Sequence, residues 1–495
     1  MVLNMEFIDL QRYSVFVISM LVIYLGNTFY KPFSKQFYWL LTKFIGYSLI
    51  SILILLSSFE TTQIMFILIT LPLSLITSLF SVEYSYMKYT SRSLVFFTDL
   101  LALTMIMTFA SKYLLELVLF WLATELVGFI LIAYDAFVGV NPEAIRASLR
   151  YLVFSMIPTD IALFTLLALT GLNPALTQYI WRLDLNFTHP VLTALIILGF
   201  MSKAALIPLH FWLPDAHSMA PAPVSSLLSG IMIKMGVYGI LLLTNYTIDI
   251  ELAHSILIAS GCLTAVYGGL QAIFQEDAKR LLAYSSISHM GVIAILTAIY
   301  LKTRDPLAYY GIIAYTATHT VFKTTLFMDT GVIEVVFHER RIDKLGFVYR
   351  VLPLESLAAS FSILAMLGLP PTIGFFAKLW MFSTVIHEIT LNYIYLLVLL
   401  VLSIEVALSI VYSAKYLQIH VKPGSSVEVS IGGSIKNLVY YVLMGSITSL
   451  FFTPVIFIET SREIVGDVLA LFTLLLPIVV ILLIGTYILI KEIIK

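Results

Sequence analysis

Apolar runs of about 20 residues recur along the whole chain, and they restrict its fold more than any other feature. As a helix, each run is long enough to cross the hydrocarbon core of a bilayer, which is about 30 Å thick. Hydrophobic residues make up 60% of the 495 residues and charged residues only 12%. Soluble proteins contain about 25% charged residues, so a soluble domain is excluded. The sequence predicts an all-α polytopic membrane protein.

The hydropathy pattern predicts about fifteen helical spans. No small-residue cleavage pattern follows the first span, and Asp9 and Arg12 precede it, so we expect it to remain as a helix. The expected spans lie near residues 13–29, 36–57, 63–83, 94–111, 113–134, 147–171, 190–206, 221–245, 251–274, 281–300, 308–335, 353–386, 393–419, 436–459 and 466–491.

The loops between these spans indicate an orientation. With the N-terminus outside, most of the loop Lys and Arg residues fall on the cytoplasmic side. This distribution favours an external N-terminus and a cytoplasmic C-terminus, and we expect the plasma membrane of a prokaryotic cell. The most basic cytoplasmic loop joins the eleventh and twelfth spans and contains Arg340, Arg341, Lys344 and Arg350.

Several function classes are excluded by composition. The formal net charge is −1 and no segment is strongly basic, so nucleic-acid binding is excluded. Cys262 is the single cysteine, which excludes an internal disulfide and a cysteine-ligated iron–sulfur cluster. Asp215 and His217 lack a third ligand nearby, so no metal site is expected in this chain. No phosphate-binding or dinucleotide-binding glycine motif is present. Any redox chemistry must therefore belong to partner subunits.

Four lysines lie within apolar spans, where a charge costs at least about 2.5 kcal/mol on insertion scales. A fifth, Lys43, is near the end of its span, and we expect its amine to reach the membrane interface. The four are the strongest functional signal in the sequence, because each needs a compensating partner or a role. They are Lys203, Lys234, Lys323 and Lys378.

Glu125 is the matching acid. It lies about 18 Å along the fifth span and is therefore near the middle of the membrane. One interpretation is a structural ion pair that holds two helices together. The other is a proton relay, because burial destabilises the charged forms of both a carboxylate and an amine and lets a proton exchange between them.

Two of the lysines lie beside interruptions of their spans. The sequence Gly-Phe-x-x-Lys ends at Lys203, with Pro208 following, and again at Lys378, where the Gly368-Leu-Pro-Pro segment precedes it. A repeated motif in two Pro- and Gly-broken spans predicts internal repeats with discontinuous helices near an ion-binding site. At a similar offset, Lys234 follows Lys203 and Glu405 follows Lys378. Glu405 could instead be a local partner of Lys378 or Lys415.

Further polar candidates lie in neighbouring spans. His319 and Lys323 are one helical turn apart on one face, and histidine titrates nearest physiological pH, so the pair suggests a proton path. His289 lies among serines in the tenth span and provides another polar lining. Asp160 lies mid-membrane in the sixth span, and its role is open.

Longer motifs resemble a known family. Residues 203–225 (KAALIPLHFWLPDAHSMAPAPVS), 275–291 (QEDAKRLLAYSSISHMG) and 368–378 (GLPPTIGFFAK) are similar to segments of the antiporter-like subunits of respiratory complex I, energy-converting membrane hydrogenases and Mrp-type Na⁺/H⁺ antiporters. The resemblance covers roughly residues 90 to 420. It implies N-terminal helices in 1–93, inverted five-helix repeats in 94–245 and 246–420 with discontinuous helices 7 and 12, and C-terminal helices in 421–495.

The resemblance also implies site residues. Glu125 matches the acid of the fifth helix, paired with Lys203 of the broken seventh, and Lys234 matches the central lysine of the eighth. His319 and Lys323 match the connecting helix, and Lys378 matches the terminal proton-exchange residue. His289, Asp160 and Glu405 are additional candidates from the residue pattern alone.

The implied function is that of a proton-translocating, antiporter-like subunit of a complex I-like oxidoreductase, without a redox centre of its own. Iron–sulfur clusters and a quinone or nickel–iron centre are expected in partner subunits. Those partners would be adjacent antiporter-like subunits, small multi-span subunits and a hydrophilic redox arm. Three alternatives stay open: a membrane-bound hydrogenase subunit, a subunit of a redox-free Mrp-type antiporter that moves Na⁺, and a scaffold whose ion pairs specify assembly. Lys378 favours the N-type or a hydrogenase or Mrp relative, whereas the Asp-Ala-His and Ser-Gly-Ile-Met-Ile-Lys motifs resemble M-type and hydrogenase-linked members.

Overall fold

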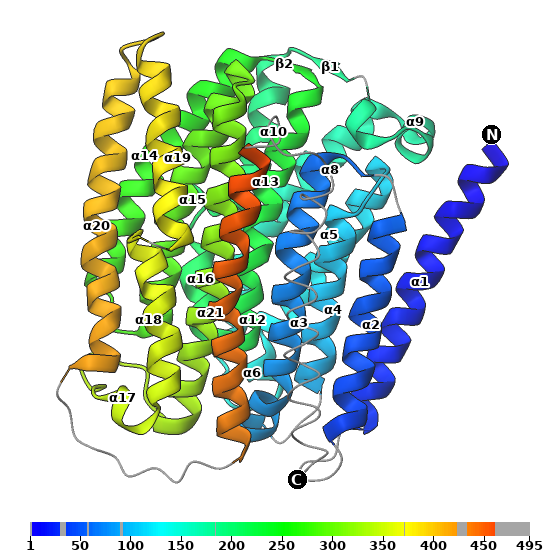
Figure 1. The fold of residues 1–495 in the computed structure, drawn as a ribbon. Coiled ribbons are helices and arrows are strands. Elements are labelled where there is room, and N and C mark those ends of the chain that lie inside the picture. The colour runs from blue at the N-terminus through cyan, green and yellow to red at the C-terminus, as the bar shows by residue number, and fades with distance from the viewer. Residues whose placement is uncertain are drawn as a thin grey trace.

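A computed structural model describes residues 2–29, 36–56, 59–89, 93–183, 185–370, 372–422 and 433–460. Its described part is almost entirely helical (Figure 1). One short parallel pair of strands, β1 (Asn186–Phe187) and β2 (Thr247–Ile248), joins two loops at one end of the bundle. The predicted all-α fold class is confirmed.

Each predicted span up to 436–459 coincides with one helix or with a run of consecutive helices. The last predicted span, 466–491, lies outside the described residues. The unbroken spans are α1 (Val2–Phe29), α2 (Gln36–Leu56), α3 (Thr61–Tyr89), α4 (Ser93–Phe109), α5 (Leu114–Ile132), α14 (Ile250–Phe274), α15 (Ala278–Thr303), α16 (Pro306–Phe337), α20 (Tyr395–Val421) and α21 (Gly433–Thr460).

The other spans are composed of shorter pieces. They are α7 (Ala144–Tyr151), the π-helical η1 (Leu152–Met156) and α8 (Ile157–Thr170); α10 (Pro190–Lys203) and α11 (Trp212–Met219); α12 (Ala222–Leu227), the π-helical η3 (Leu228–Met232) and α13 (Ile233–Leu242); and α18 (Pro353–Leu367) and α19 (Ile373–Ile389). Short connecting elements are α6 (Tyr134–Phe137), α9 (Leu172–Thr177), the 3₁₀ turns η2 (Ile180–Arg182) and η4 (Leu243–Asn245), and α17 (Val348–Val351).

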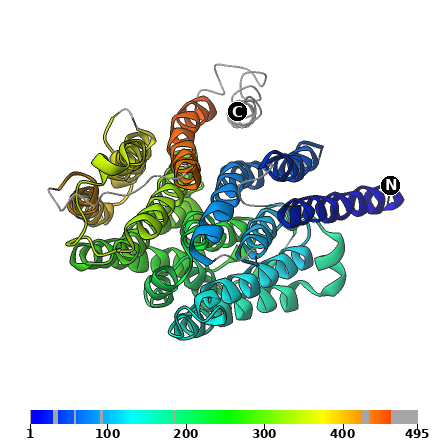
Figure 2. The ribbon, with the colours of Figure 1, turned by 90° about the horizontal axis from the view of Figure 1, so that it is seen from below.

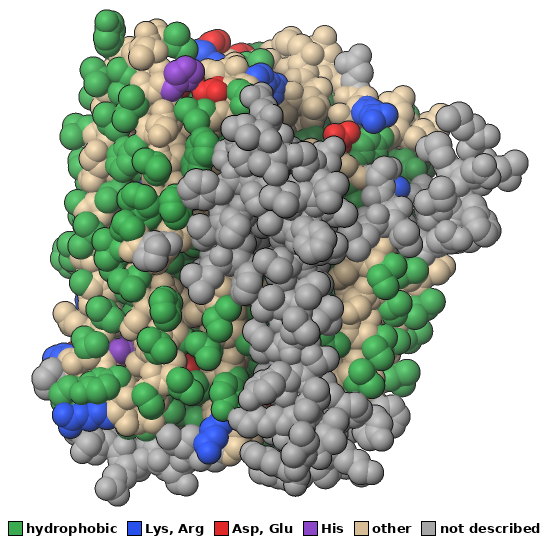
Figure 3. Space-filling model, viewed as in Figure 1, with side chains coloured by type: hydrophobic (Ala, Val, Ile, Leu, Met, Phe, Trp, Pro, Cys, Tyr) green, Lys and Arg blue, Asp and Glu red, His purple; other side chains and the backbone are tan. Residues whose placement is uncertain are grey.

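The surface fits a membrane environment. Within the described residues, seven helical spans are long and apolar enough to cross a membrane by length and composition. Apolar side chains cover the sides of the molecule, whereas the visible Lys, Arg, Asp and Glu side chains gather mainly toward its two ends (Figure 3). The N-terminus lies at the end opposite to α17, which contains Arg350 of the basic loop (Figure 1).

Helix α16 packs against helices from both ends of the chain. It is 32 residues long and packs against α3, α12 and α15 as well as against α18, α19 and α21. Seen along the bundle, α1 lies at one edge and α20 toward the other (Figure 2). His319 and Lys323 lie near the middle of α16, and both are buried.

Both predicted interruptions are present. The seventh span stops at Lys203 and resumes as a helix at Trp212. The twelfth stops at Leu367, and α19 begins at Ile373. Pro208 lies in the first break, where a missing backbone N–H prevents the helix from continuing. Gly368, with φ of +78°, ends α18 in the left-handed conformation that favours glycine.

The expectation for Lys43 is wrong. Its side chain is fully buried, and its Nζ lies 2.6 Å from Oδ2 of Asp99, which is also buried. Lys43 also donates a hydrogen bond of 2.6 Å to the Ser78 hydroxyl. The amine is therefore neutralised by an acid on α4 and does not reach the interface. Hydropathy alone could not reveal that Asp99 faces α2.

A buried row of charged and polar side chains

The first ion pair of the row joins Lys203 on α10 to Glu125 on α5. Nζ of Lys203 lies 2.8 Å from Oε1 of Glu125, and neither side chain is exposed. Lys203 also donates to the Tyr151 hydroxyl at 2.8 Å, and Trp121 Nε1 donates to Glu125 Oε1 at 3.1 Å. Oε2 of Glu125 has no hydrogen-bond partner among the described residues. Asp160 on α8 lies close enough for its charge to act on both members of the pair.

Local structure explains why Lys203 reaches Glu125. Lys203 is the last residue of α10, so the chain turns away immediately after the amine has been placed. Helix ends leave backbone carbonyl groups without an intrahelical partner. The Ser202 carbonyl oxygen accepts from the Ala205 backbone N–H at 3.2 Å and also from the Trp212 indole N–H at 3.0 Å. The sequence that follows the lysine therefore both breaks and caps the helix.

Lys234 is the next member of the row. Its Nζ donates to the Ser229 carbonyl at 2.5 Å and lies 2.5 Å from Nδ1 of His319. Ser229 belongs to η3, and the wider turn of a π-helix leaves carbonyl groups without their usual i+4 donor. Lys234 thus has a neutral acceptor and an imidazole as partners, and no carboxylate among the described residues forms a salt bridge with it.

The connecting helix extends the row. His319 packs edge-on against His289, with ring centroids 5.4 Å apart. One turn further, Lys323 donates to the Leu282 carbonyl at 2.9 Å and to the Ser285 hydroxyl. All three side chains are buried. The predicted pair on one face of α16 is therefore brought together with the predicted histidine of α15.

His289 links the connecting helix to α20. Its Nδ1 lies 2.9 Å from the Tyr315 hydroxyl, and its Nε2 lies 3.0 Å from the Tyr412 hydroxyl. Oε1 of Glu405 is 3.6 Å from Nδ1 of His289 and 3.5 Å from the hydroxyls of Ser288 and Tyr412. Glu405 is completely buried, and its other oxygen has no partner among the described residues.

Lys378 lies at the second helix break. Its Nζ donates to the Leu367 carbonyl, at the end of α18, and to the Ser409 hydroxyl, both at 2.8 Å. The charge of Glu405 acts on Lys378, but no hydrogen bond joins them. Lys415 instead donates to the Ile273 carbonyl at 2.7 Å. Of the two local partners considered for Glu405, Lys378 is its electrostatic neighbour, and His289 is its nearest basic group.

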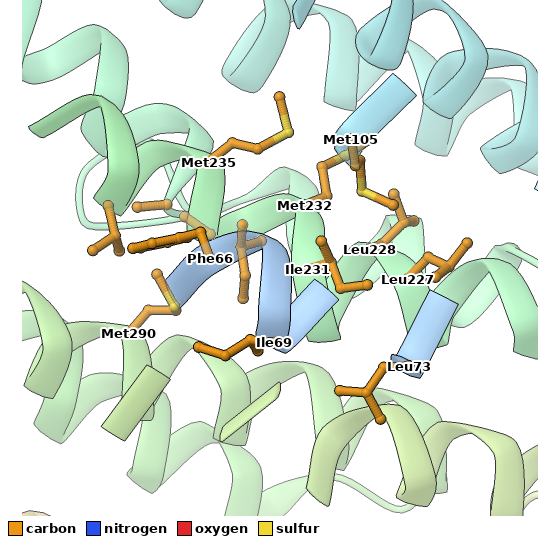
Figure 4. Packing of buried hydrophobic residues seen from close by; sticks show 14 of the residues in the cluster. Phe66, Ile69, Leu73, Met105, Leu227, Leu228, Ile231, Met232, Met235 and Met290 are labelled. Carbon is orange, nitrogen blue, oxygen red and sulfur yellow. The ribbon is translucent and has the colours of Figure 1, made fainter. Parts of the chain in front are cut away.

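The row has one apolar interruption. Within the described residues, no hydrogen bond or salt bridge joins Lys203 to Lys234. Met232 precedes Lys234 by two residues, and its sulfur lies 3.5 Å from the Tyr151 hydroxyl, to which Lys203 donates. Figure 4 shows Met232 and Met235 among buried apolar side chains of α3, α4 and η3, including Phe66 and Met105. The first ion pair is thus separated from the rest of the row by hydrophobic packing.

The motif of residues 275–291 contributes a second set of charges, toward the α17 end of the molecule. Nζ of Lys279 lies 3.1 Å from Glu334, which is also 3.0 Å from Lys88. Lys279 donates to the Ala220 carbonyl at 3.1 Å. These contacts connect α3, α15 and α16 at the α17 end of the molecule.

Sequence reasoning missed the neutral members of the row. Tyr151, Ser229, Ser409 and Tyr412 supply hydroxyl or carbonyl groups to the predicted residues. Ser285, one of the serines expected beside His289, is in contact with Lys323. Serine and tyrosine are common in this chain, so their positions carry no signal without the fold. The π-helical segments η1 and η3 also cannot be predicted from hydropathy.

One group of metal-ligating side chains lies apart from the row. Asp305, His387 and Glu388 bring one potential ligand atom each to within 4.8 Å of one another in the described part of the chain. Nδ1 of His387 is 3.0 Å from Oδ2 of Asp305. The group joins the start of α16 to the end of α19, far along both helices from His319 and Lys378.

Buried ionisable side chains that contact one another inside a helical bundle characterise membrane proteins with an ion pathway. This class agrees with the comparison to known families. Residues 111–405 match the family described as "NADH:quinone oxidoreductase/Mrp antiporter, TM", which is more than half of the chain. The chain therefore belongs to this family, and the resemblance stated from its motifs is confirmed.

The individual relatives belong to different kinds of membrane complex. It is 29% identical over 400 residues to F(420)H(2) dehydrogenase subunit N of Methanosarcina mazei, which covers 76% of this chain and 77% of that subunit. It is 31% identical over 311 residues to a probable K(+)/H(+) antiporter subunit of Rhizobium meliloti, covering 62% of this chain. The chain spans only 30% of the length of that antiporter subunit.

The fold is found in a solved respiratory complex. A chain of the membrane-bound sulfane sulfur reductase (MBS), an archaeal respiratory membrane complex, matches with a TM-score of 0.73 and 23% identity. The match covers 93% of this chain and 98% of that chain. At this level of identity the likeness establishes the shared fold alone.

Proposed function

We propose that this chain is a proton-translocating, antiporter-like membrane subunit of a complex I-like oxidoreductase. The observation that carries the proposal is the contact of Lys234 with His319, an amine and an imidazole 2.5 Å apart in the bundle interior. Two basic groups at that distance cannot both hold an extra proton without strong repulsion. One proton shared between them is the arrangement that a relay requires.

The remaining residues take roles according to their contacts. Glu125 and Lys203 exchange a proton within their pair, and the charge of Asp160 influences the balance between them. A proton on His319 passes toward His289, whose two nitrogens contact the hydroxyls of Tyr315 and Tyr412. Hydroxyl groups both donate and accept, so they can relay a proton from an imidazole toward Glu405. Glu405 and Lys378 then form the terminal exchange pair.

Proton transfer past the apolar side chains around Met232 depends on a change in the protonation of the Lys203–Glu125 pair. A proton on Lys203 neutralises the Glu125 carboxylate, and its loss leaves that charge uncompensated in the interior. Electrostatic coupling of this kind acts over distance because the interior screens charges poorly. We propose that the state of the first pair controls the Lys234–His319 pair through charge, with residues 94–245 and 246–420 as the two inverted repeats.

Redox chemistry is assigned to partner subunits. Iron–sulfur clusters together with a quinone or nickel–iron site would lie in a hydrophilic arm, and adjacent antiporter-like and small multi-span subunits would complete the membrane part. The relative in Methanosarcina is named as a dehydrogenase subunit, which supports this proposal. The orientation proposed has the N-terminus outside and the basic loop before α17 in the cytoplasm of a prokaryotic cell.

A redox-free antiporter is the second candidate, and the relative in Rhizobium meliloti supports it. Purification of the native assembly in mild detergent, mass spectrometry of its chains and EPR spectroscopy separate the two. Iron–sulfur signals and hydrophilic catalytic chains are expected. Multi-span chains alone, without metal signals, would overturn the redox assignment in favour of Na⁺/H⁺ or K⁺/H⁺ exchange.

The relay itself is tested in proteoliposomes that contain the purified assembly and a pH-sensitive dye. Lys234→Met is expected to abolish proton translocation while the assembly still forms. Lys302→Met is the matched control, because Lys302 is a partly exposed lysine at the end of α15 that pairs with exposed Glu251. Normal translocation by Lys234→Met would contradict the relay.

A further inference from the structure

A second group of buried acids lies outside the row and has no assigned role. Asp329 on α16 and Glu355 on α18 are both completely buried. Among the residues that the structure describes, neither forms a salt bridge with a lysine or arginine, and the only basic partner of Asp329 is His420 on α20, 3.2 Å away. The charge that acts on Glu355 is that of Asp329.

The hydrogen bonds distinguish the two carboxyl groups. Oδ2 of Asp329 accepts from the Tyr416 hydroxyl at 2.6 Å and faces Nε2 of His420 at 3.2 Å. Nδ1 of His420 lies 3.0 Å from the Ser356 hydroxyl. In the tautomer of His420 that carries its proton on Nε2, two donors therefore face one oxygen of Asp329 and stabilise it as an anion. Glu355 has none of these: neither of its oxygens has a hydrogen-bond partner among the described residues.

Asp329 and Glu355 belong to helices that pack directly against each other, α16 and α18. Two carboxylates buried together cannot both be ionised, because like charges and desolvation oppose the second charge. A proton on Glu355 removes this conflict. The protonated carboxyl group becomes a donor, and Oδ1 of Asp329 is a buried acceptor that has no other partner among the described residues. A single proton therefore satisfies two otherwise unpaired atoms.

We propose that Asp329, Glu355, Tyr416 and His420 form a proton-binding site in which Glu355 holds one proton that it shares with Asp329. The site would serve as a reservoir for the second half of the row. Asp329 follows Lys323 by six residues on the same helix, about 9 Å along its axis. The site lies on the α17 side of Lys323, because Glu355 is at the start of α18 and His420 is at the end of α20. This reservoir role depends on the proposed relay, whereas the shared proton does not.

Infrared difference spectroscopy of the purified assembly tests the site. In the carboxylic-acid C=O region, the wild-type protein is expected to show a band at neutral pH that Glu355→Gln removes. Asp329→Asn should shift the same band, because its hydrogen-bond acceptor changes. Glu251→Gln is the control, since Glu251 is an exposed carboxylate paired with Lys302, and it should leave the band unchanged.

Two outcomes would overturn the proposal. If Glu355→Gln removes intensity from the carboxylate region and none from the carboxylic-acid region, the proton is absent. If Asp329→Asn leaves the band unshifted, the proton is not shared. The spectra do not depend on transport, so a failed proton site remains distinguishable from a failed relay. Given the band, a reservoir predicts slower proton translocation for Glu355→Gln with a normal amount of assembled protein, and an unchanged rate would reject that role.

Discussion

The lysines at the two helix breaks have different partners. In the first half, Lys203 forms a hydrogen-bonded ion pair with Glu125. In the second half, Lys378 is bonded to a carbonyl and a serine hydroxyl, while Glu405 lies next to His289. The same sequence motif therefore places an amine at a break in both halves, but only the first has its acid in contact. The first lysine is therefore held by an ion pair, whereas the second is held by neutral acceptors.

Breaking the first pair is expected to have the largest effect. Glu125→Gln leaves a buried lysine without its counter-ion, which typically costs about 3–5 kcal/mol. Lys203→Met leaves a buried carboxylate and should cost a similar amount. We expect both variants to reduce the thermal stability and the yield of the purified assembly. Yield and stability equal to those of the wild type would show that Glu125 and Lys203 are not in contact in the functional assembly.

Removing the charge of Glu405 should reduce the stability of the assembly less. Glu405→Gln retains both hydrogen bonds of Lys378, so we expect a loss of about 1 kcal/mol, the scale of one hydrogen bond. Thermal denaturation of the two purified variants compares the halves directly. A loss for Glu405→Gln as large as that for Glu125→Gln would contradict the asymmetry and would imply a direct contact between Glu405 and Lys378.

Gly368 tests how the second lysine is placed. It has a φ of +78°, and a Cβ there would lie 2.5 Å from Cδ of Lys378. Gly368→Ala should therefore combine backbone strain of about 1 kcal/mol with displacement of the amine. Gly139→Ala is the matched control, because Gly139 has a φ of +76° and a Cβ added there would meet no described atom within 4 Å. Reduced translocation is expected for Gly368→Ala alone; equal effects would assign the loss to the backbone.

The smallest effect concerns the cap of the first break. Trp212→Phe removes the N–H that the Ser202 carbonyl accepts and should cost about 1 kcal/mol or less while leaving translocation intact. Thermal denaturation together with the dye assay measures both quantities. A large loss of translocation at normal stability would give Trp212 a role beyond capping.

Much of the fold and of the row could be predicted from the sequence. Hydropathy predicts the spans, and the free-energy cost of burying a charge identifies Glu125 and the four lysines before any fold is known. Lys43 shows the limit, because a position near a span end predicts access to the interface only if no acid faces it. The same limit applies to Asp329 and Glu355, whose adjacency depends on how α16 packs against α18.

Other contacts depend on irregular backbone. The carbonyl that Lys234 uses belongs to a π-helical turn at η3, and Tyr151 directly precedes another at η1. Such turns insert one residue into a helix while the segment as a whole stays apolar, so hydropathy cannot detect them. The pairing of His289 with Tyr412 is a long-range contact between separate helices, and it could not be derived from spacing.

The central claim is that the first ion pair moves protons and does not only hold helices together. The double variant Glu125→Gln/Lys203→Met removes both charges at once, so it restores the electrostatic balance that each single variant loses. Proton translocation per electron transferred should be measured for this variant in proteoliposomes that contain the full assembly. The relay predicts normal assembly with translocation reduced to background. Normal assembly with normal translocation would contradict it and would leave the pair a structural role.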